Sequence, residues 1–389
     1  MTIPLIFYYH RLNCYSFNAL AGALDADADF HDLRIDLALS IDQLQTMAAA
    51  SFNRHGRAIA ALSILTCQFE DTHQIMGDLR SRFGAKIKIL AGGPHATACP
   101  DEVLGSGADV VFRGEAEITF PAALKRIITE QPCEPIKTAA TPVELDSFCS
   151  FSPQRGMFGP IEITRGCAFA CNYCQTSRIF GTELRHKSIG AIVRQAEALR
   201  SVNRKVVRLL SPNAFSYGSP DGRQINLASM RELLSALRSS LEKNTKIIFA
   251  HFPSEVRPEH VVPETLDLVK EFAGNDEIVI GAQSGSDRLL NVCHRSHDIA
   301  SVLRAIVLAR KYGFKIIVDF IFGLPGETPS DLAETLKVME EVVRLGARIH
   351  PHIFAPLPQT PFAGTQPGRI SPQVAEALEA LKNRRGIYE

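Results

Sequence analysis

The sequence predicts an α/β protein in two parts, each a parallel sheet covered by helices. Apolar runs of four to eight residues alternate with amphipathic helical segments along most of the 389 residues, a pattern typical of parallel strands joined by helical crossovers. A proline-rich stretch without clean periodicity, residues 131–156, separates the two parts and indicates a linker. No internal repeat or low-complexity segment competes with this interpretation.

Residues 1–130 are predicted to form a Rossmann-like, doubly wound domain. Short apolar strands are expected at residues 3–9, 58–65, 86–93 and 108–115, with helices at 16–25 and 69–83. In such a sheet, ligands bind at the carboxyl ends of the strands. A dinucleotide is not expected there, because no GxGxxG motif follows a strand.

Residues 157–365 are predicted to form a partial, TIM-like (β/α)6 barrel without eightfold closure. Its six strands are expected at residues 159–166, 206–213, 246–252, 277–285, 315–327 and 348–358. Five helical crossovers are expected between them, at residues 189–202, 227–243, 263–274, 299–313 and 330–346. Residues 366–389 leave room for a C-terminal helix.

The composition is that of a globular protein with no excess of positive or negative charge. Hydrophobic residues make up 46% of the chain, and 42 lysines and arginines balance 42 aspartates and glutamates. Nucleic acid is therefore not expected as the main partner. No window approaches a membrane span and no basic leader precedes an apolar run. We expect a cytoplasmic protein without a membrane partner, whose nine cysteines are reduced.

Three of those cysteines, Cys167, Cys171 and Cys174, lie within eight residues, directly after the first predicted strand of the second part. Loops at the carboxyl ends of barrel strands are where such folds keep their active sites. A structural zinc site normally uses two ligand pairs, and no second CxxC or HxxxH follows downstream. Three thiolates instead suit a 4Fe–4S cluster with one iron left open to a small molecule.

The stretch "RGCAFACNYC" at residues 165–174 resembles the cluster motif of the radical S-adenosylmethionine superfamily. Three more stretches are similar to motifs that this family places around S-adenosylmethionine: "GAQSGSD" at 281–287, "FIFGLPGET" at 320–328 and "HIFAPLPQTPFA" at 352–363. The resemblance implies that the open iron chelates S-adenosylmethionine. It also implies that the reduced cluster cleaves this cofactor to a 5′-deoxyadenosyl radical, with an external flavodoxin- or ferredoxin-type electron donor.

The same resemblance assigns candidate S-adenosylmethionine contacts. Tyr173 takes the aromatic position near the adenine, and Gln283 and Ser284 take the ribose position. The remaining candidates surround the adenine or face the methionyl group: Phe322, Gly323, Phe354, Ser211 and Asn213. The last two depart from the family, because "SPNAF" stands where a glycine-glycine-glutamate-like turn is usual.

The N-terminal part resembles the cobalamin-binding (B12-binding) domain that precedes the radical domain in a large subgroup. The resemblance is carried by "YSFNAL" at residues 15–20 and by the segment from "AGGPHATACP" to "VVFRGEAEITF", residues 91–120. It implies that the following residues contact cobalamin: Tyr15, Ser16, Gly92, Gly93, Pro94 and His95. The Asp-x-His-x-x-Gly motif that ligates cobalt in many such domains is missing. Either cobalt is bound without a lower protein ligand, or the fold is kept without the cofactor.

Taken together, the resemblances imply a cobalamin-dependent radical S-adenosylmethionine enzyme, most commonly a methyltransferase that acts on an unactivated carbon of a small molecule or peptide. Ring-forming or rearranging chemistry without methyl transfer is an alternative, as is a non-catalytic iron–sulfur or corrinoid carrier. A further alternative resembles the methylthiotransferases, with a second cluster on Cys14, Cys67 and Cys99. Neither a catalytic side chain nor the substrate can be assigned from the sequence.

Overall fold

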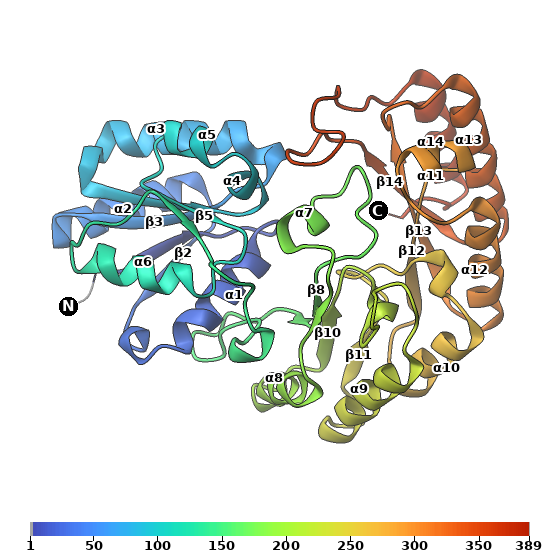
Figure 1. Cartoon of the computed structure of the whole chain (residues 1–389), viewed down its shortest axis with the longest axis horizontal. Helices are drawn as coiled ribbons and strands as arrows, with labels where there is room; N and C mark the ends of the chain where they lie inside the picture. The colour runs from blue at the N-terminus through green and yellow to red at the C-terminus, as the bar shows by residue number, and fades with distance from the viewer. Residues whose placement is uncertain (1–2, 389) are drawn as a thin grey trace. The chain divides into compact units, whose positions relative to one another are not determined.

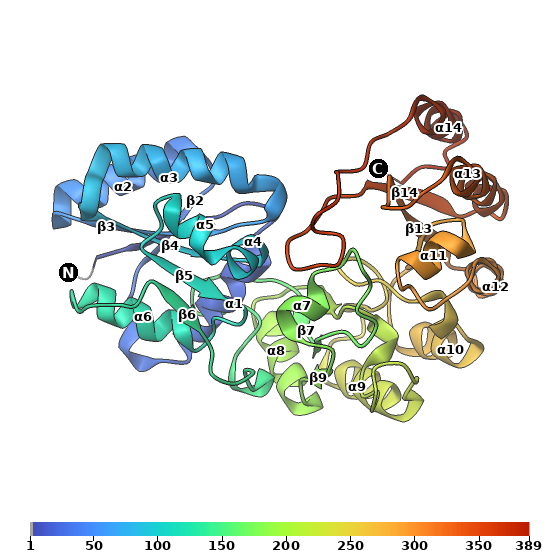
Figure 2. The same cartoon turned by 45° about the horizontal axis from the view of Figure 1, so that its top comes forward.

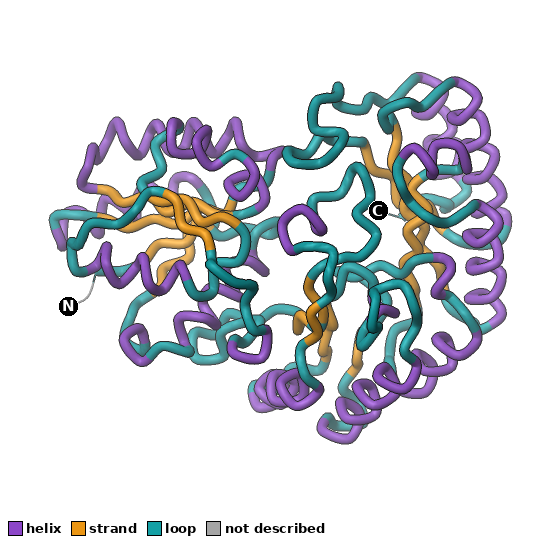
Figure 3. Tube along the Cα trace, in the orientation of Figure 1, coloured by secondary structure: helices purple, strands orange, loops and turns teal. Residues whose placement is uncertain are grey.

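A computed structural model of the protein describes residues 3–388. The chain divides into two compact units, residues 1–160 (unit 1) and residues 161–389 (unit 2). In both units, strands lie inside and helices outside (Figure 3). Among the described helices, none is both long and apolar enough to cross a membrane.

Unit 1 is a doubly wound domain around a six-stranded, fully parallel sheet in the order β2-β1-β3-β4-β5-β6 (Figure 1). The strands are β1 (Leu5–Tyr8), β2 (Ile35–Ala38), β3 (Ala58–Ser63), β4 (Ile87–Gly92), β5 (Val110–Arg113) and β6 (Ile136–Thr138). The helices are α1 (Cys14–Asp25), α2 (Ile41–His55), α3 (Phe69–Phe83), α4 (Pro94–Ala98), α5 (Pro100–Gly105) and α6 (Thr119–Ile128). The strand order reverses between β1 and β3, the point where such sheets bind ligands.

Helices cover both faces of this sheet because successive side chains of each strand point to opposite sides. Leu5 and Phe7 of β1 belong to one apolar cluster with residues of α1 and α6. Ile6, between them, belongs to a second cluster with residues of α2, α3 and α5. Figure 2 shows the two helix layers on either side of the sheet. This burial on both faces explains why the central strands appear in the sequence as continuous apolar runs.

The structure adds elements that the sequence pattern did not predict. β2 and α2 lie between the helix expected at residues 16–25 and the strand expected at residues 58–65. β2 is a short edge strand, and most of its residues are only partly buried. Residues 136–138, inside the expected linker, form β6 and pair with β5. Arg155 near the end of that segment also packs on unit 1, through an ion pair with Asp25 at 2.9 Å, and just after the segment the Phe158 carbonyl accepts from Asn18 at 2.9 Å. The prolines therefore mark surface loops here, and the compact unit continues to residue 160.

Unit 2 confirms the predicted partial barrel. Its six parallel strands form two sheets, β11-β10-β7 and β12-β13-β14. The strands are β7 (Ile161–Glu162), β10 (Val206–Leu210), β11 (Lys246–Ile248), β12 (Glu277–Gln283), β13 (Lys315–Phe322) and β14 (Arg348–Ile353). A parallel bridge between Val256 and Ile280 connects the two sheets.

Helices form the outer layer of unit 2 (Figures 1 and 3). The five crossovers are α8 (Ile189–Ser201), α9 (Leu227–Ser240), α10 (Pro263–Phe272), α12 (Ile299–Lys311) and α13 (Pro329–Arg344). The smaller elements are β8 (Thr164–Arg165), α7 (Thr176–Phe180), β9 (Arg185–His186), α11 (Asp287–Val292) and α14 (Pro372–Asn383). β8 pairs with β9 in antiparallel fashion, so the segment between them is held as a closed loop.

Candidate functional site

The closed loop between β8 and β9 carries the three clustered cysteines. It begins at Gly166, whose φ of +90° is costly for other residues, and a side chain there would lie 2.3 Å from the carbonyl oxygen of Glu183. The backbone N–H of Cys174 then donates to the carbonyl of Cys171 at 3.1 Å. The glycine and this turn fold the loop back on itself, which brings Cys167 near the other two cysteines.

The three thiols lie close enough to influence one another. Burial raises the pKa of Cys167, and the thiols of Cys174 and Cys171 raise it further. Two other groups of ligand atoms among the described residues converge to within 4.8 Å, and the three thiols are not one of them. A single zinc ion with Zn–S bonds of about 2.3 Å would bring its sulfurs within about 4 Å of one another. The wider spacing fits the separate irons of a 4Fe–4S cluster better than one ion.

A buried arginine that the sequence analysis missed lies against this loop. Arg295 donates from Nη1 to the Cys171 sulfur at 3.7 Å and from Nη2 to the Gly281 carbonyl at 2.8 Å. Burial favours its neutral form, but the acidic groups Tyr173, Cys171 and Glu255 outweigh this effect and raise the pKa of Arg295. It therefore stays cationic beside the cluster cysteines. No sequence signal separates it from the chain's other arginines, because its position depends on contacts between distant segments.

An apolar cluster beside the cysteine loop brings together three of the predicted adenine-contacting segments. It contains Leu324 from the turn after β13, Phe354 after β14, and Tyr173 from the cysteine loop. Cys293 also belongs to it, and burial raises the pKa of this thiol to about 12. Cys293 is thus a buried thiol of the apolar core next to the loop.

The end of β13 lies against the segment that follows β14. The Phe354 N–H donates to the Phe322 carbonyl at 2.9 Å. Gly323 has a φ of +73°, and a side chain there would lie 2.5 Å from the Cα of Gly368. This close backbone approach requires a glycine at 323. The predicted contacts of Phe322, Gly323 and Phe354 with adenine stay predictions, but the three residues lie together.

The two predicted ribose residues point to different surroundings. Gln283 ends β12 at a bulge, with a φ of 74°, and its side-chain amide donates to Glu255 at 3.4 Å. Burial, and then the charge of Asp319, raise the pKa of Glu255 to about 7. Ser284 is buried instead against α13, with its Oγ 3.4 Å from the Oγ1 of Thr335. Gln283 thus keeps a polar contact beside Arg295 and Glu255, whereas the hydroxyl of Ser284 is used within the fold.

The residues predicted to face the methionyl group are buried and hydrogen-bonded within the protein. The Ser211 hydroxyl donates to the Asn213 carbonyl at 2.8 Å. The Asn213 side chain lies 2.9 Å from Nδ1 of His260 and accepts from the Arg257 N–H at 3.3 Å. These contacts fix the turn after β10. Their role toward S-adenosylmethionine stays a prediction.

Asp331 connects α13 to the residues that follow the predicted ribose contacts Gln283 and Ser284. We predict that its hydrogen bonds stabilise unit 2. Its carboxylate accepts from Ser286 at 2.6 Å and from Arg288 at 3.0 Å, and it also caps α13 through Thr328. Hydrogen bonding to Arg288 is the largest cause that holds the pKa of Asp331 well below its usual range. We expect Asp331→Asn to lower the free energy of unfolding by about 1–3 kcal/mol at pH 7.

The sign of the pH dependence follows from the lowered pKa. The contribution of Asp331 is complete above the usual aspartate pKa of about 4 and is lost as the pH falls toward the lower value in the folded protein. Other carboxyl groups titrate equally in both proteins. The difference in unfolding free energy between wild type and Asp331→Asn should therefore shrink between pH 5 and pH 2, as measured by denaturant unfolding. A difference that stays constant with pH would contradict this assignment.

In unit 1, apolar side chains gather at the carboxyl edge of the sheet. Every large hydrophobic residue that this unit exposes among its described residues follows the end of β1, β2 or β5: Leu12, Tyr15, Leu39, Ile41 and Ile118. Tyr15, one of the predicted cobalamin contacts, is 44% exposed at the start of α1, and Ser16 is next to it. Exposed apolar groups around the ligand edge of a doubly wound sheet fit a large, largely apolar ring system such as a corrin.

The predicted glycine-rich contacts continue this edge from β4 into α4. Gly92 ends β4, Gly93 follows with a φ of +94°, and Pro94 begins α4. A side chain at Gly93 would lie 2.7 Å from the backbone nitrogen of Ile64, which follows β3. The glycine therefore allows the ends of β3 and β4 to approach closely.

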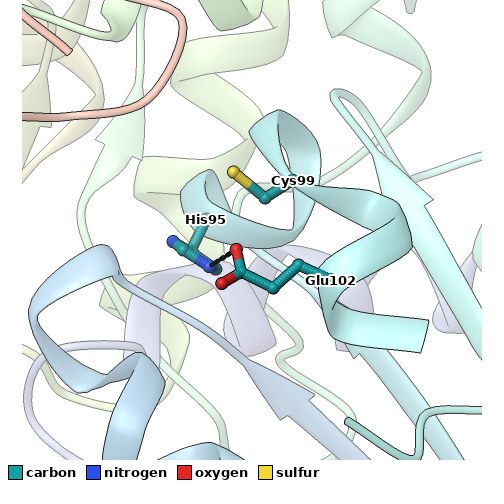
Figure 4. A group of neighbouring side chains, drawn as sticks. All are labelled: His95, Cys99 and Glu102. Carbon is teal, nitrogen blue, oxygen red and sulfur yellow. Dashed lines mark ion pairs between the residues drawn. The ribbon is translucent and has the colours of Figure 1, made fainter. Parts of the chain in front are cut away.

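His95 is held inside unit 1. It is buried and stacks on Phe69, with ring centroids 4.2 Å apart. Its Nδ1 lies 3.3 Å from Oγ1 of Thr66, and its Nε2 lies 3.2 Å from Glu102. Figure 4 shows the pair with Glu102, and Cys99 where α4 meets α5. Because both ring nitrogens have neighbours within the unit, His95 is not free to ligate cobalt in this arrangement, and a cobalamin contact by His95 stays a prediction.

Replacing Gly93 with alanine is expected to destabilise unit 1. The substitution combines a strained φ with a clash against backbone atoms, and we expect it to cost at least about 2 kcal/mol. The matched control is Gly77→Ala in α3, where nothing lies within 4 Å of the added carbon; this change should be neutral or stabilise by up to about 1 kcal/mol. Thermal unfolding of the two variants measures the contrast. Equal midpoints would contradict it.

Two protein families match the two units. Residues 161–339 match the radical SAM superfamily, and residues 11–124 match the B12 binding domain. An uncharacterised protein of Methanopyrus kandleri is 25% identical, over 83% of this chain and 72% of its own length. Threonylcarbamoyladenosine tRNA methylthiotransferase MtaB of Thermotoga maritima is also 25% identical, over 80% of this chain and 69% of its own.

Solved structures share the fold of both units. The cobalamin-dependent S-adenosylmethionine radical enzyme OxsB aligns with a TM-score of 0.65 and 16% identity, over 98% of this chain. This chain spans only 56% of the OxsB chain. The radical S-adenosylmethionine methyltransferase TsrM from Kitasatospora setae aligns with a TM-score of 0.67 and 15% identity, over 93% of this chain and 77% of its own. At these identities the likeness concerns the fold.

Proposed function

Because this chain belongs to the radical SAM superfamily and carries a B12-binding domain, we propose that it is a methyltransferase that acts on an unactivated carbon of a small molecule or peptide. Its cofactors are a 4Fe–4S cluster, S-adenosylmethionine and cobalamin. When bound, the cluster supplies the electron that cleaves S-adenosylmethionine, and cobalamin supplies the carrier for the methyl group. The observation that carries the proposal is the mutually interacting thiol triplet at a barrel rim, in one chain with a B12-binding domain.

In this proposal, the residues of unit 2 bind the cluster and orient S-adenosylmethionine. Cys167, Cys171 and Cys174 hold three irons and leave the fourth open. The Arg295 guanidinium, next to Cys171, supplies positive charge beside the cluster and can pair with a carboxylate at the open iron. Tyr173, with the apolar cluster around it, excludes water from the place where a radical forms.

Unit 1 is proposed to bind cobalamin at the apolar carboxyl edge of its sheet. Loops that follow β1 and β4 would hold the corrin through Tyr15, Ser16 and the backbone around Gly93. His95 is held by its neighbours within the unit, so this chain favours cobalt without a lower histidine ligand from that position. The electron comes, in this proposal, from an external flavodoxin- or ferredoxin-type donor in the cytoplasm.

The products of S-adenosylmethionine test the proposed reaction. The protein is reconstituted anaerobically with iron, sulfide and hydroxocobalamin, then incubated with S-adenosylmethionine and a strong reductant. Formation of both 5′-deoxyadenosine and S-adenosylhomocysteine is expected, the second only when cobalamin is present. Formation of 5′-deoxyadenosine alone, with and without cobalamin and across candidate substrates, would favour rearrangement chemistry. Formation of neither would fit a non-catalytic carrier.

A methylthiotransferase-like enzyme is the second candidate, because one structural observation favours it. Cys14, Cys67 and Cys99 follow β1, β3 and β4, which are neighbours in the sheet, so all three lie at the same edge. The titration of these thiols gives no such support. Burial raises the pKa of Cys14 and of Cys99, and the causes of these shifts include no thiol of another residue.

The second candidate is tested by the triple variant Cys14→Ala, Cys67→Ala and Cys99→Ala. Methyl transfer without a second cluster predicts unchanged iron and acid-labile sulfide. A second cluster on these cysteines predicts that about half of the sulfide is lost. The matched control replaces Cys133 and Cys149, two other partly exposed thiols of the same unit, and should leave the sulfide content unchanged in either case.

A further inference from the structure

A second group of metal-ligand side chains lies in unit 2, apart from the cysteine loop. Asp319 of β13 is directly opposite His350 of β14 in the parallel register. His352 lies two residues further along β14, and side chains two apart on a strand share a face. The three side chains therefore converge on one face of the sheet because of strand register, without help from any loop.

The ligand atoms of these residues are close together. Oδ1 of Asp319 lies 2.7 Å from Nδ1 of His350 and 3.4 Å from Nε2 of His352. One ligand atom from each residue lies within 4.8 Å of the others. The imidazole rings are 4.3 Å apart and nearly perpendicular, at 72°. One small cation could reach all three without a change in the backbone.

The two histidines reach only one oxygen of the aspartate, and the second oxygen has the Glu255 carboxyl group as its neighbour. Only 2% of its side chain is exposed, and the histidines approach its Oδ1 alone. The other oxygen, Oδ2, is buried and accepts no hydrogen bond from a described N–H or hydroxyl group. A buried acceptor without a donor costs about 1–3 kcal/mol. The carboxyl group of Glu255 lies beside Asp319 as well, and two adjacent carboxylates are stabilised by a cation, which can be a shared proton, a protonated His352 or a metal ion.

We propose that Asp319, His350 and His352 bind one divalent transition-metal ion of the zinc, cobalt or manganese type, with Glu255 as the adjacent carboxyl group. Two imidazoles and one carboxylate are the ligands that such ions use when coordination positions remain open for water or for a substrate oxygen. Asp319 is buried, whereas 43% of the His352 side chain is exposed, so the open positions face the accessible side. The three ligands are not among the residues assigned to the cofactors, and only the adjacent Glu255 contacts one of these, Gln283, at 3.4 Å.

The other converging group, His95, Cys99 and Glu102, lacks this charge arrangement. Its carboxylate is 52% exposed, so water can solvate it and no ion is required. This group also contains a thiol, which gives a different optical signature with cobalt. It therefore serves as an internal comparison for the experiment.

The test counts bound zinc in the reconstituted holoprotein after equilibration with zinc and removal of excess metal. We expect one zinc ion per chain in addition to the cluster iron. The double variant His350→Ala and His352→Ala should lose it, and Asp319→Asn should weaken zinc binding at least tenfold, with unchanged cluster iron in both as the check on folding. The matched control is His251→Ala, which removes another histidine of unit 2 paired with a carboxylate, Glu277, at 3.1 Å; it should keep the zinc.

Cobalt in place of zinc identifies the ligands. Nitrogen and oxygen ligands give weak visible bands without sulfur-to-cobalt charge transfer, and the bands should disappear in the double variant. The proposal is overturned if wild type holds no zinc beyond the cluster, if the double variant keeps it, or if the cobalt spectrum shows thiolate bands that are lost in Cys99→Ser. The first outcome would leave a shared proton between Glu255 and Asp319, or a protonated His352, as the cation of this site.

Discussion

Replacing Cys171 with alanine is expected to remove the cluster and abolish formation of 5′-deoxyadenosine. Cys171 is the buried member of the triplet, and it has the Arg295 contact. With two thiolates left, a cubic cluster loses one of its three protein ligands and opens a second iron to solvent. We expect the iron and sulfide content to fall at least about fivefold, as measured chemically and by the loss of visible absorption.

Cys293→Ala is the matched control for this prediction. Cys293 is also buried, and it belongs to the apolar cluster next to the same loop. Because it lies outside the segment that carries Cys167, Cys171 and Cys174, it is not expected to ligate iron. The control variant should therefore keep its iron and its cleavage activity. If Cys293→Ala loses the cluster and Cys171→Ala keeps it, the assignment of ligands is wrong.

Replacing Arg295 with leucine is expected to weaken S-adenosylmethionine binding by about 10- to 150-fold. The guanidinium is buried between the Cys171 sulfur and the Gly281 carbonyl. Hydrogen bonds to charged groups contribute about 1.5–3 kcal/mol, which corresponds to this range of affinity. Removing the cation also takes positive charge away from the cluster, which disfavours the added electron, so the reduction potential of the cluster should fall. Equilibrium binding of S-adenosylmethionine and a redox titration measure the two effects.

Two further variants, one at Arg295 and one at Arg304, separate the loss of charge at Arg295 from an effect on folding. Arg295→Lys keeps the charge but loses the forked geometry, and should lose less affinity than the leucine variant. Arg304→Leu removes an arginine whose side chain is 71% exposed on the neighbouring α12, and should bind S-adenosylmethionine as wild type does. Iron content reports whether each variant has folded. Unchanged affinity in Arg295→Leu, with full iron content, would exclude the proposed role.

Local patterns in the sequence were sufficient to predict the fold class, whereas the cluster on Cys167, Cys171 and Cys174 stays a prediction. The central strands β12 and β13 of unit 2 were visible as apolar runs because nearly all of their residues are buried, and the cysteine spacing drew attention to the loop. β2 and β6 were not predicted: they are short and partly exposed, and their pairing depends on β1 and β5 rather than on their own residues. Local periodicity cannot report such edge strands.

Site residues that depend on contacts between distant segments could not be found in the same way. Arg295 is 124 positions from Cys171. Asp319 and His350 meet only through the register of β13 and β14. Motif resemblance assigned Gln283 and Ser284 the same role, but the structure shows Gln283 beside Glu255 and Ser284 against α13. Gln283 is the last residue of β12 and has a φ of 74°, so the chain changes direction before Ser284, and a linear motif does not contain that turn.

The ratio of acid-labile sulfide to cobalt in one reconstituted preparation tests the central claim most directly. The protein is loaded anaerobically with iron, sulfide and hydroxocobalamin and freed of unbound cofactors, and both are then counted per chain. One cluster on Cys167, Cys171 and Cys174 with one corrinoid predicts about four sulfides and about one cobalt. About eight sulfides per chain without cobalt would contradict the account and support a two-cluster enzyme. Fewer than about one sulfide per chain would show that no cluster is bound and would also contradict the account.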